Sequence, residues 1–440
     1  MPKANVASRY LEEAIQEVIR NKDQYVTNPG KDFSRNRKLG LEDLIHMLIN
    51  MGGGSLTQEI IKYSKYANTD VTKSALVQQR QKLLSTAFLA IYESFTKKCS
   101  LNKKYMGYRL LAVDGTSASV YTNAKKARVA NSKKDPYATI HLNALYDLCN
   151  NIYLHAYAQG RHEADERDTL IRMKEKLNPK EKAIIIADRG YESFNTIAHF
   201  VESKNADLLL RVKQGKGAIR EIAELPMIEL DCNLTVGIAT SQTNEDKAAK
   251  LHFVQTGSKK GKKNSKKTVI SRWDFASPYD LKFRVVRFQL DTGMYETLVT
   301  TLPRNKFSCD DLKALYHSRW GIETSFRELK YATGLVNIKA KGVDAALQEV
   351  YISLIKYNYC ESIIGEIVIY QSKQNKHIYV VNHTAAIQLC LDFYREGSKN
   401  SRKLELDIAR HTLPHRPGRK DKRKNVQAKS FTWFAYRVAA

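Results

Sequence analysis

Tyr316, Arg319, Glu323 and Lys330 place a hydroxyl, a guanidinium, a carboxylate and an ammonium close together in the chain. The surrounding stretch, 316–330, has no proline and one glycine, and Ser-Cys-Asp-Asp at 308–311 is a helix start signal. On an α-helix the four side chains fall within about 60° of one another, with the outer two roughly 21 Å apart along the axis. Such a stripe suits a phosphate backbone, with the carboxylate free to hold a metal ion. A merely solvated helix face is the alternative.

Two more carboxylates, Asp114 and Asp188, each follow an apolar run typical of a buried β-strand, 109–113 and 183–187. In layered α/β folds functional sites gather at the exposed ends of such strands. Three carboxylates brought together with Glu323 would repel one another unless a divalent cation neutralised them. Oxygen-only ligands favour Mg²⁺ or Mn²⁺, and two such ions about 3.5–4 Å apart support in-line phosphoryl transfer. Either aspartate alone is equally typical of a turn or a helix cap.

The elements that must position these residues form a mixed α/β layer. Apolar, β-branched runs predict strands at 109–113, 138–148, 152–158, 183–187 and 207–212, and helical spacing predicts helices at 166–177 and 193–204. The helical pattern returns at 309–331 and from about 345 to 370. Between them lies a β-rich insertion with predicted strands at 228–239, 268–275, 281–290 and 296–301. Its loop at 256–267 carries six lysines and no acid, which favours a basic, flexible segment.

The first hundred residues favour short helices. One spans 39–49 and stops at the glycines 52–54, Ser55 with Gln58 forms a capping box for the next, and a third starts near Thr72. These helices fit either a helix-turn-helix-like DNA reader, with Gln78, Gln79 and Arg80 pointing outward, or an ordinary small bundle.

Charge and composition narrow the class of partner. The net charge of +26 and a pI near 9.6 predict a polyanionic partner, most simply nucleic acid. We expect no membrane association, because no run approaches membrane-spanning length and no lipid anchor or signal peptide is evident. The six cysteines lie at least 30 residues apart, which indicates reduced thiols in a cytosolic protein.

Taken together, these motifs resemble those of bacterial insertion-sequence transposases of the DDE type, in the branch with a β-strand insertion before the third acid. The resemblance rests on Val-Asp-Gly-Thr at 113–116, Ile-Ala-Asp-Arg-Gly-Tyr at 186–191, and the spacing Tyr-x2-Arg-x3-Glu-x6-Lys from Tyr316 to Lys330. It covers roughly residues 30–420, and its three motifs occur in the expected order.

This resemblance implies an RNase H-like core in which Asp114, Asp188 and Glu323 are the catalytic acids and bind two Mg²⁺ or Mn²⁺ ions. It assigns Tyr316, Arg319 and Lys330 to the phosphates of the transposon end. The expected reaction is cleavage at terminal inverted repeats, then joining of the 3′-hydroxyls to target double-stranded DNA. A homodimer would pair two ends, in the cytoplasm on nucleoid DNA. Two alternatives are an RNase H-like nuclease without strand transfer and a catalytically idle DNA-binding relic or repressor.

The predicted organisation has five parts: a helical DNA-binding domain at 1–104, the first part of the catalytic core at 105–213, the β-rich insertion at 214–305, the second part of the core at 306–400, and a basic tail at 401–440. Within the tail, residues 410–429 carry eight Lys and Arg against one Asp. We expect this segment to be disordered until it binds DNA.

Several residues have weaker signals. Arg189 lies beside the second acid and either contacts DNA or merely flanks a turn. Trp273 fits either stacking on a flipped base or an ordinary strand aromatic. Trp320 is expected to pack into the core, and Glu328 falls away from the stripe. The acids of 162–166 look like a solvated helix start rather than a metal cluster.

Overall fold

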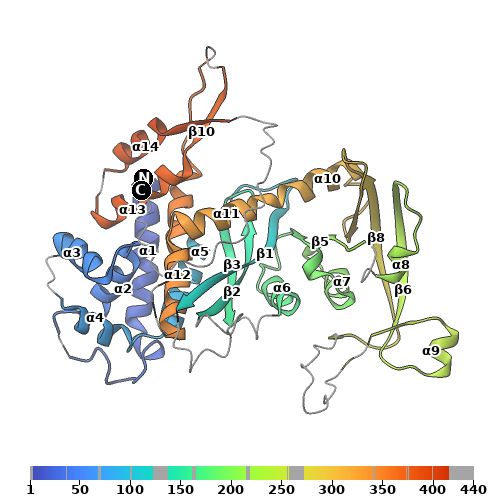
Figure 1. The fold of residues 1–440 in the computed structure, drawn as a ribbon, viewed down its shortest axis with the longest axis horizontal. Coiled ribbons are helices and arrows are strands. Elements are labelled where there is room, and N and C mark those ends of the chain that lie inside the picture. Colours follow the sequence, from blue (N-terminus) through green and yellow to red (C-terminus); the bar gives the residue numbers. More distant parts are fainter. Residues whose placement is uncertain are drawn as a thin grey trace.

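The computed structural model describes residues 3–415 except 36, 68–70, 100–101, 122–136, 161–164, 215–218, 255, 257–271, 339, 341, 373, 375 and 399. A mixed sheet of nine strands extends from the middle of the molecule to the end opposite the N-terminal helices (Figure 1). Its order is β3 (Ile152–Gly160), β2 (Tyr137–Asp147), β1 (Arg109–Tyr121), β4 (Ala183–Ala187), β5 (Ala206–Arg211), β9 (Tyr295–Thr300), β8 (Tyr279–Gln289), β6 (Leu230–Ala239) and β7 (His252–Phe253). The predicted mixed α/β layer is confirmed.

Two parallel pairings sit at the centre of this sheet. β1 pairs in parallel with β4, and β4 in parallel with β5. The pairs β1–β2, β2–β3, β5–β9, β9–β8 and β8–β6 are antiparallel, and the short edge strand β7 is parallel to β6. The parallel register of β1 and β4 ends at Val113 opposite Ala187, so Asp114 and Asp188 follow side by side. Neighbouring strands lie about 4.8 Å apart. The topology therefore brings together two acids that are far apart in sequence.

The sequence pattern predicted that the strand ends just before Asp114, but β1 continues past this residue. It continues to Tyr121, paired with β2 as far as the register of Tyr121 with Tyr137. The polar run after Asp114 reads as a turn, but its backbone groups are satisfied by β2. Asp114 therefore lies where β1 loses its partner β4, not at the end of β1 itself.

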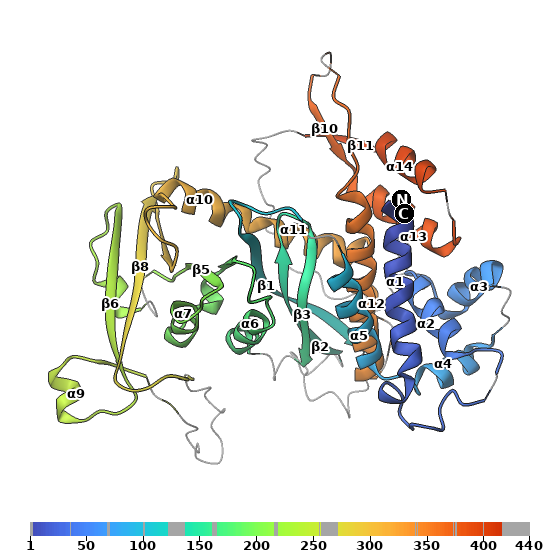
Figure 2. The same cartoon turned by 180° about the vertical axis from the view of Figure 1, so that it is seen from behind.

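Helices cover both faces of the sheet (Figure 2). α6 (Glu166–Glu175) and α7 (Phe194–Val201) pack on the face to which Leu111 and Val113 point. The opposite face, to which Ala112 points, is covered by α5 (Ser85–Lys98), α11 (Trp320–Tyr331) and α12 (Val343–Ile364), and α10 (Cys309–Ser318) continues the layer over Ile184 and Ile186. Because strand residues alternate between faces, Asp114 points to the same side as Ala112, towards α11.

The N-terminal helices share the largest core with this second layer. Apolar residues of α1 (Lys3–Arg20), α2 (Leu41–Asn50), α12 and α13 (His383–Arg395) belong to one buried cluster. α3 (Leu56–Ala67) and α4 (Lys73–Arg80) follow, and the predicted capping box of Ser55 and Gln58 is present. The outward orientation that the DNA-reader alternative required is wrong for Gln79 and Arg80: Gln79 is buried, and Arg80 donates to Gln348 and the carbonyl of Ala345 on α12. The predicted boundary at residue 104, between a DNA-binding domain and the catalytic core, stays a prediction.

The insertion strands do not form a separate sheet. β9, β8 and β6 extend the central sheet, which confirms the strands predicted near 296–301, 281–290 and 228–239. The strand predicted at 268–275 is wrong for 272–275, which are not in a strand, and the rest lies outside the described residues. Two short helices, α8 (Arg220–Ala223) and α9 (Asn244–Ala248), complete this part.

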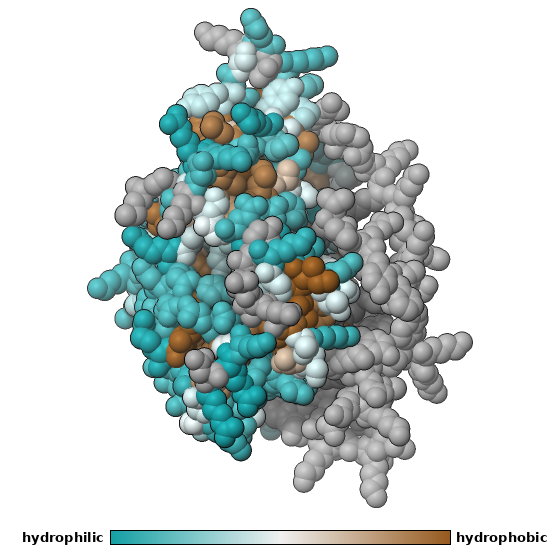
Figure 3. All heavy atoms as spheres, turned by 90° about the vertical axis from the view of Figure 1, so that its left-hand side faces the viewer, coloured by the Kyte–Doolittle hydropathy of each residue, from teal (hydrophilic) through white to brown (hydrophobic). Residues whose placement is uncertain are grey.

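The C-terminal part folds back onto the N-terminal helices. α13 packs on α12, and α14 (Ser401–Arg410) contacts α13 and α1. β10 (Ile378–Val381) and β11 (Thr412–His415) form a two-stranded ribbon that projects from the molecule (Figure 1). The surface at this end is mainly hydrophilic, with hydrophobic residues in separate patches (Figure 3). Across the described part of the chain, no helix has the length and apolar character needed to cross a bilayer.

Candidate active site

Asp114 and Asp188 are held in the same way. Asp114 Oδ1 accepts a hydrogen bond from the amide of Gly115 at 2.8 Å, and Asp188 Oδ1 accepts one from the amide of Arg189 at 2.7 Å. In each case the next residue in the chain fixes one carboxylate oxygen. The cap interpretation is thus correct for Asp188, which caps the short 3-10 helix that follows it, and wrong for Asp114, which lies within β1. Oδ2 of each side chain is left for other partners.

The helix predicted over 309–331 is interrupted at a single residue. α10 ends at Ser318, α11 begins at Trp320, and Arg319 between them keeps helical dihedral angles. Its amide bonds to the carbonyl of Tyr316 and its carbonyl accepts from Ile322, both three residues away rather than four. This tightened turn lies beside Asp114, at the point where β1 loses its partner β4.

At that turn the predicted residues meet. Arg319 Nη2 lies 2.8 Å from Glu323 Oε1, and Nη1 lies 3.7 Å from Asp114 Oδ2. The hydroxyl of Tyr316 donates to Asp188 Oδ1 at 3.4 Å. The structure therefore brings Asp114, Asp188 and Glu323 around one guanidinium and one phenol.

The candidate active site holds more negative than positive charge. Burial raises the pKa of Asp114 to about 6; Glu323 and Asp188 add to the increase, and the Gly115 amide and Arg319 oppose it. Three carboxylates face the single guanidinium of Arg319, which leaves a surplus of two negative charges when all are ionised. Arg319 is 5% exposed, and its buried Nε has no hydrogen-bond partner among the described residues. An oxygen-only donor set with this surplus fits hard divalent cations such as Mg²⁺ or Mn²⁺.

Tyr316 is also buried, and burial raises its pKa to about 12, so the phenol keeps its proton at neutral pH. It can therefore act as a hydrogen-bond donor towards a carboxylate or a phosphate oxygen.

Within the described part of the chain, the side chains of Lys330 and Arg189 make no hydrogen bond or ion pair with these five residues, although the Arg189 amide bonds to Asp188. Lys330 is half-buried on α11, burial lowers its pKa, and its ammonium has no partner within the described part of the chain. Arg189 is exposed on the short 3-10 helix η2 (Arg189–Tyr191), directly after Asp188. Both cations are thus near the site in sequence and available to an anionic ligand.

One carboxylate that the sequence analysis assigned to solvent reaches this region. A Cβ atom built on Gly115 would lie 2.7 Å from Glu166 Oε1, and one built on Gly190 would lie 3.3 Å from Glu166 Oε2. Glu166 therefore occupies the space beside the two glycines that follow Asp114 and Asp188, on the α6 side of the sheet. His141 on β2 pairs with Glu166 Oε1 at 2.9 Å. In the sequence, only the glycines of Asp-Gly at 114–115 and Asp-Arg-Gly at 188–190 hint that another side chain packs beside the two acids.

A second carboxylate lies on the insertion side. Glu296 on β9 is buried and pairs with Arg211 at 3.3 Å. Burial raises its pKa, and Asp188 contributes in the same direction. The sequence alone could not predict that Glu296 lies near the candidate site, because its pattern is that of any polar residue in a β-strand.

The two tryptophans behave differently from each other. Trp273 packs against Phe275 and Tyr279 at centroid distances of 5.4 and 5.5 Å, and its Nε1 donates to the carbonyl of Ala276. This favours the structural interpretation of Trp273. Trp320, expected in the core, is instead 44% exposed, with the Arg319 guanidinium 5.5 Å from its ring.

Comparison with known proteins identifies the class as a transposase: a model of the family described as "Transposase DDE domain" matches residues 105–359. Because this match covers more than half of the chain, the protein belongs to that family, whose members use divalent metal ions. No curated protein matches the chain. Among solved structures, the chain is similar to the piggyBac transposase in a synaptic complex with hairpin DNA, with 12% identity, a TM-score of 0.47, and coverage of 97% of this chain and 88% of that chain.

Proposed function

We propose that this protein is a DNA transposase that binds terminal inverted repeats, cleaves the ends by phosphodiester hydrolysis and joins the 3′-hydroxyls to target DNA. One observation carries the proposal: Arg319 pairs with both Asp114 and Glu323, while Tyr316 holds Asp188. Acids from β1, from the residue after β4 and from α11 converge there, as a DDE site requires. The strand order β3-β2-β1-β4-β5 supports the RNase H-like core that the sequence resemblance implies.

In this proposal Asp114, Asp188 and Glu323 hold two Mg²⁺ or Mn²⁺ ions. Bound divalent ions would supply Lewis-acid activation of the attacking oxygen and stabilisation of the leaving oxygen. The amides of Gly115 and Arg189 orient the two aspartates in advance, which lowers the cost of ordering them. Arg319 neutralises part of the carboxylate charge, and bound ions would supply the remaining positive charge.

The cationic residues would bind the DNA backbone. Arg319 offers a planar guanidinium with an unused Nε, Tyr316 a protonated hydroxyl, and Lys330 and Arg189 charges without partners among the described residues. Two donors in contact with the three acids, with two further cations close by in sequence, suit a phosphodiester better than a small neutral substrate. We propose double-stranded DNA as the partner and a homodimer as the unit that pairs two ends.

A strand-transfer assay tests this function against its alternatives. A labelled duplex carrying the element's own terminal repeat is incubated with a supercoiled plasmid, the protein and Mg²⁺. Labelled ends joined to the plasmid identify a transposase. Cut ends without joined product identify an RNase H-like nuclease without strand transfer, and tight binding without cutting identifies a DNA-binding relic or repressor.

A further inference from the structure

A second group of ionisable side chains lies on the side of α11 that faces away from the candidate active site. Glu328 of α11, Glu361 of α12 and His383 of α13 each offer one ligand atom, and these atoms lie within 4.8 Å of one another. His383 Nδ1 is 3.0 Å from Glu361 Oε1 and 4.0 Å from Glu328 Oε1. The cluster connects three helices, one of which carries Glu323.

The burial of Glu361 makes this cluster unusual. Its side chain is completely inaccessible to solvent, and its Oε2 atom has no hydrogen-bond partner among the described residues. A buried carboxylate oxygen without a partner costs several kcal/mol or more, so such atoms are rare in native folds. Glu361 therefore needs a further positive or hydrogen-bonding partner beyond His383.

The charges of the cluster point to a cation. Two carboxylates and a neutral imidazole carry two negative charges, and protonation of His383 would still leave one. Burial raises the pKa of Glu328, and the hydrogen bond with Glu361 raises that of His383. The hydroxyl of Tyr357 donates to Glu328 Oε2 at 3.3 Å, but it contributes no charge. A divalent ion would neutralise both carboxylates at once.

We propose that Glu328, Glu361 and His383 form a binding site for a first-row divalent transition metal of the Zn²⁺ type, which clamps α11 to α12 and α13. A histidine nitrogen with two carboxylates is a donor set that Zn²⁺ accepts and that Mg²⁺ does not prefer. Ligand atoms around Zn²⁺ at about 2.0–2.1 Å are separated by roughly 3.4 Å. The ligand atoms of Glu328, Glu361 and His383, which lie within 4.8 Å of one another, are therefore close to the separation that a Zn²⁺ site requires. Glu328 and His383 are partly exposed and give an ion access.

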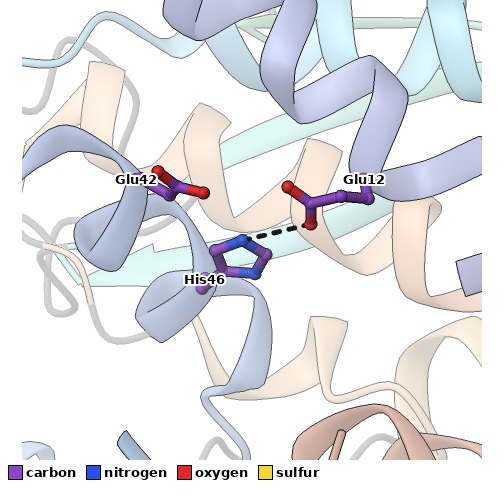
Figure 4. Close-up of side chains that lie close together, drawn as sticks. All are labelled: Glu12, Glu42 and His46. Atoms are coloured by element: carbon purple, nitrogen blue, oxygen red, sulfur yellow. Dashed lines mark ion pairs between the residues drawn. The ribbon is translucent and has the colours of Figure 1, made fainter. Parts of the chain in front are cut away.

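A similar cluster elsewhere in the chain lacks these features and serves as a control. Figure 4 shows Glu42 and His46 on one helix and Glu12 facing them from another. Gln16 donates to Glu12 and Glu42, and His46 lies 3.3 Å from Glu12 Oε2 and contacts the hydroxyl of Tyr394. These groups already have partners, Glu42 is exposed to water and Glu12 is partly exposed, so no ion is needed.

The test measures metal binding and does not depend on DNA cleavage. Full-length protein carrying Glu323→Gln, which weakens the proposed catalytic site, is treated with a chelator and titrated calorimetrically with Zn²⁺ in excess Mg²⁺. We expect one tight site per chain and a higher thermal midpoint with Zn²⁺. Adding His383→Ala or Glu328→Gln, both at partly exposed positions, should weaken that site at least tenfold.

The His46→Ala change, in the control cluster, should leave Zn²⁺ affinity unchanged. The proposal is overturned if the chain binds no Zn²⁺, or if His383→Ala and Glu328→Gln bind it as tightly as the parent. It is also overturned if His46→Ala removes the tight site. Circular dichroism of each variant shows whether lost binding reflects lost folding, and Glu328→Gln provides a second reading where His383→Ala does not fold.

Discussion

Arg319 Nη2 lies 2.8 Å from Glu323 Oε1, so the two residues form an ion pair at the start of α11, beside the point where β1 loses its partner β4. The same guanidinium reaches Asp114 with its other terminal nitrogen. Because Arg319 is buried, these contacts are made in a poorly solvated environment, where charges act strongly on one another. Arg319 thus occupies the position of a counter-ion for two of the three acids.

The Arg319→Ala change should destabilise the protein chiefly when no divalent ion is present. Removing the guanidinium leaves Asp114 and Glu323 without compensation, and we expect the free energy of unfolding to fall by about 1–3 kcal/mol, since Glu323 is partly solvated. Addition of Mg²⁺ or Mn²⁺ should recover part of this loss. Urea unfolding with EDTA and with Mg²⁺ measures the difference. An equal loss in both conditions would show that no ion replaces the guanidinium.

Gly115→Ala should disturb strand β1 beside Asp114. The new methyl group would lie 2.7 Å from both Glu166 Oε1 and His141 Nε2, so this ion pair must shift. Overpacking of this kind costs about 1–3 kcal/mol. Thermal unfolding of Gly115→Ala checks this, and a second change, Glu166→Ala, should reduce the penalty. Gly190→Ala is the matched control, because its nearest contact is 3.3 Å and the expected loss is smaller. Equal losses at the two glycines would refute the role assigned to Glu166.

His155 on β3 should make stability fall as the pH drops from 6.5 to 4. Burial, assisted by Lys176, lowers the pKa of His155 to about 4 from the ordinary value of 6.5. Between these values the unfolded chain binds a proton that the folded chain does not, which favours unfolding by up to about 2–3 kcal/mol. Chemical unfolding of the parent and of His155→Gln across this range isolates the effect. If both proteins lose stability in parallel, His155 is not the cause.

Deletion of residues 416–440 should weaken DNA binding and flatten its dependence on salt. Most of the Lys and Arg residues of the basic tail lie in this segment, whereas β11 ends at His415 and its pairing with β10 is preserved. Each lost phosphate contact lowers the slope of log affinity against log salt by about 0.9. Titrations of a labelled duplex at several salt concentrations give the slope. An unchanged slope would mean that the tail does not contact phosphates.

The parts of the fold that the sequence predicted well are those in which one periodic signal dominates. The run 183–187 is apolar on both faces, and β4 has the same bounds. The acids Asp114 and Asp188 could be paired in advance because parallel strands end at one edge of a sheet. β1 beyond Val113 was missed, since its polar residues resemble a turn and their pairing partner lies some twenty residues further along the chain.

The unpredicted features depend on distant packing. An acid at a helix start has the same sequence pattern whether it points into water or, like Glu166, towards two glycines of other elements. Arg80 reads as an exposed helix residue, but α12 passes beside it and accepts its hydrogen bonds. Trp320 follows a break in the helix that turns it into solvent, which a continuous helical projection cannot show.

The central claim is that Asp114, Asp188 and Glu323 form one metal-dependent cleavage site. Its most direct test is nicking of a labelled terminal-repeat duplex with Mg²⁺ and with EDTA by the parent, by Glu323→Gln and by Asp310→Asn, an exposed acid on α10. We expect Mg²⁺-dependent nicking at the repeat boundary by the parent and Asp310→Asn, and a loss of about 10³-fold or more in Glu323→Gln. Nicking by Glu323→Gln at the parent's rate, or undiminished nicking in EDTA, would contradict the account.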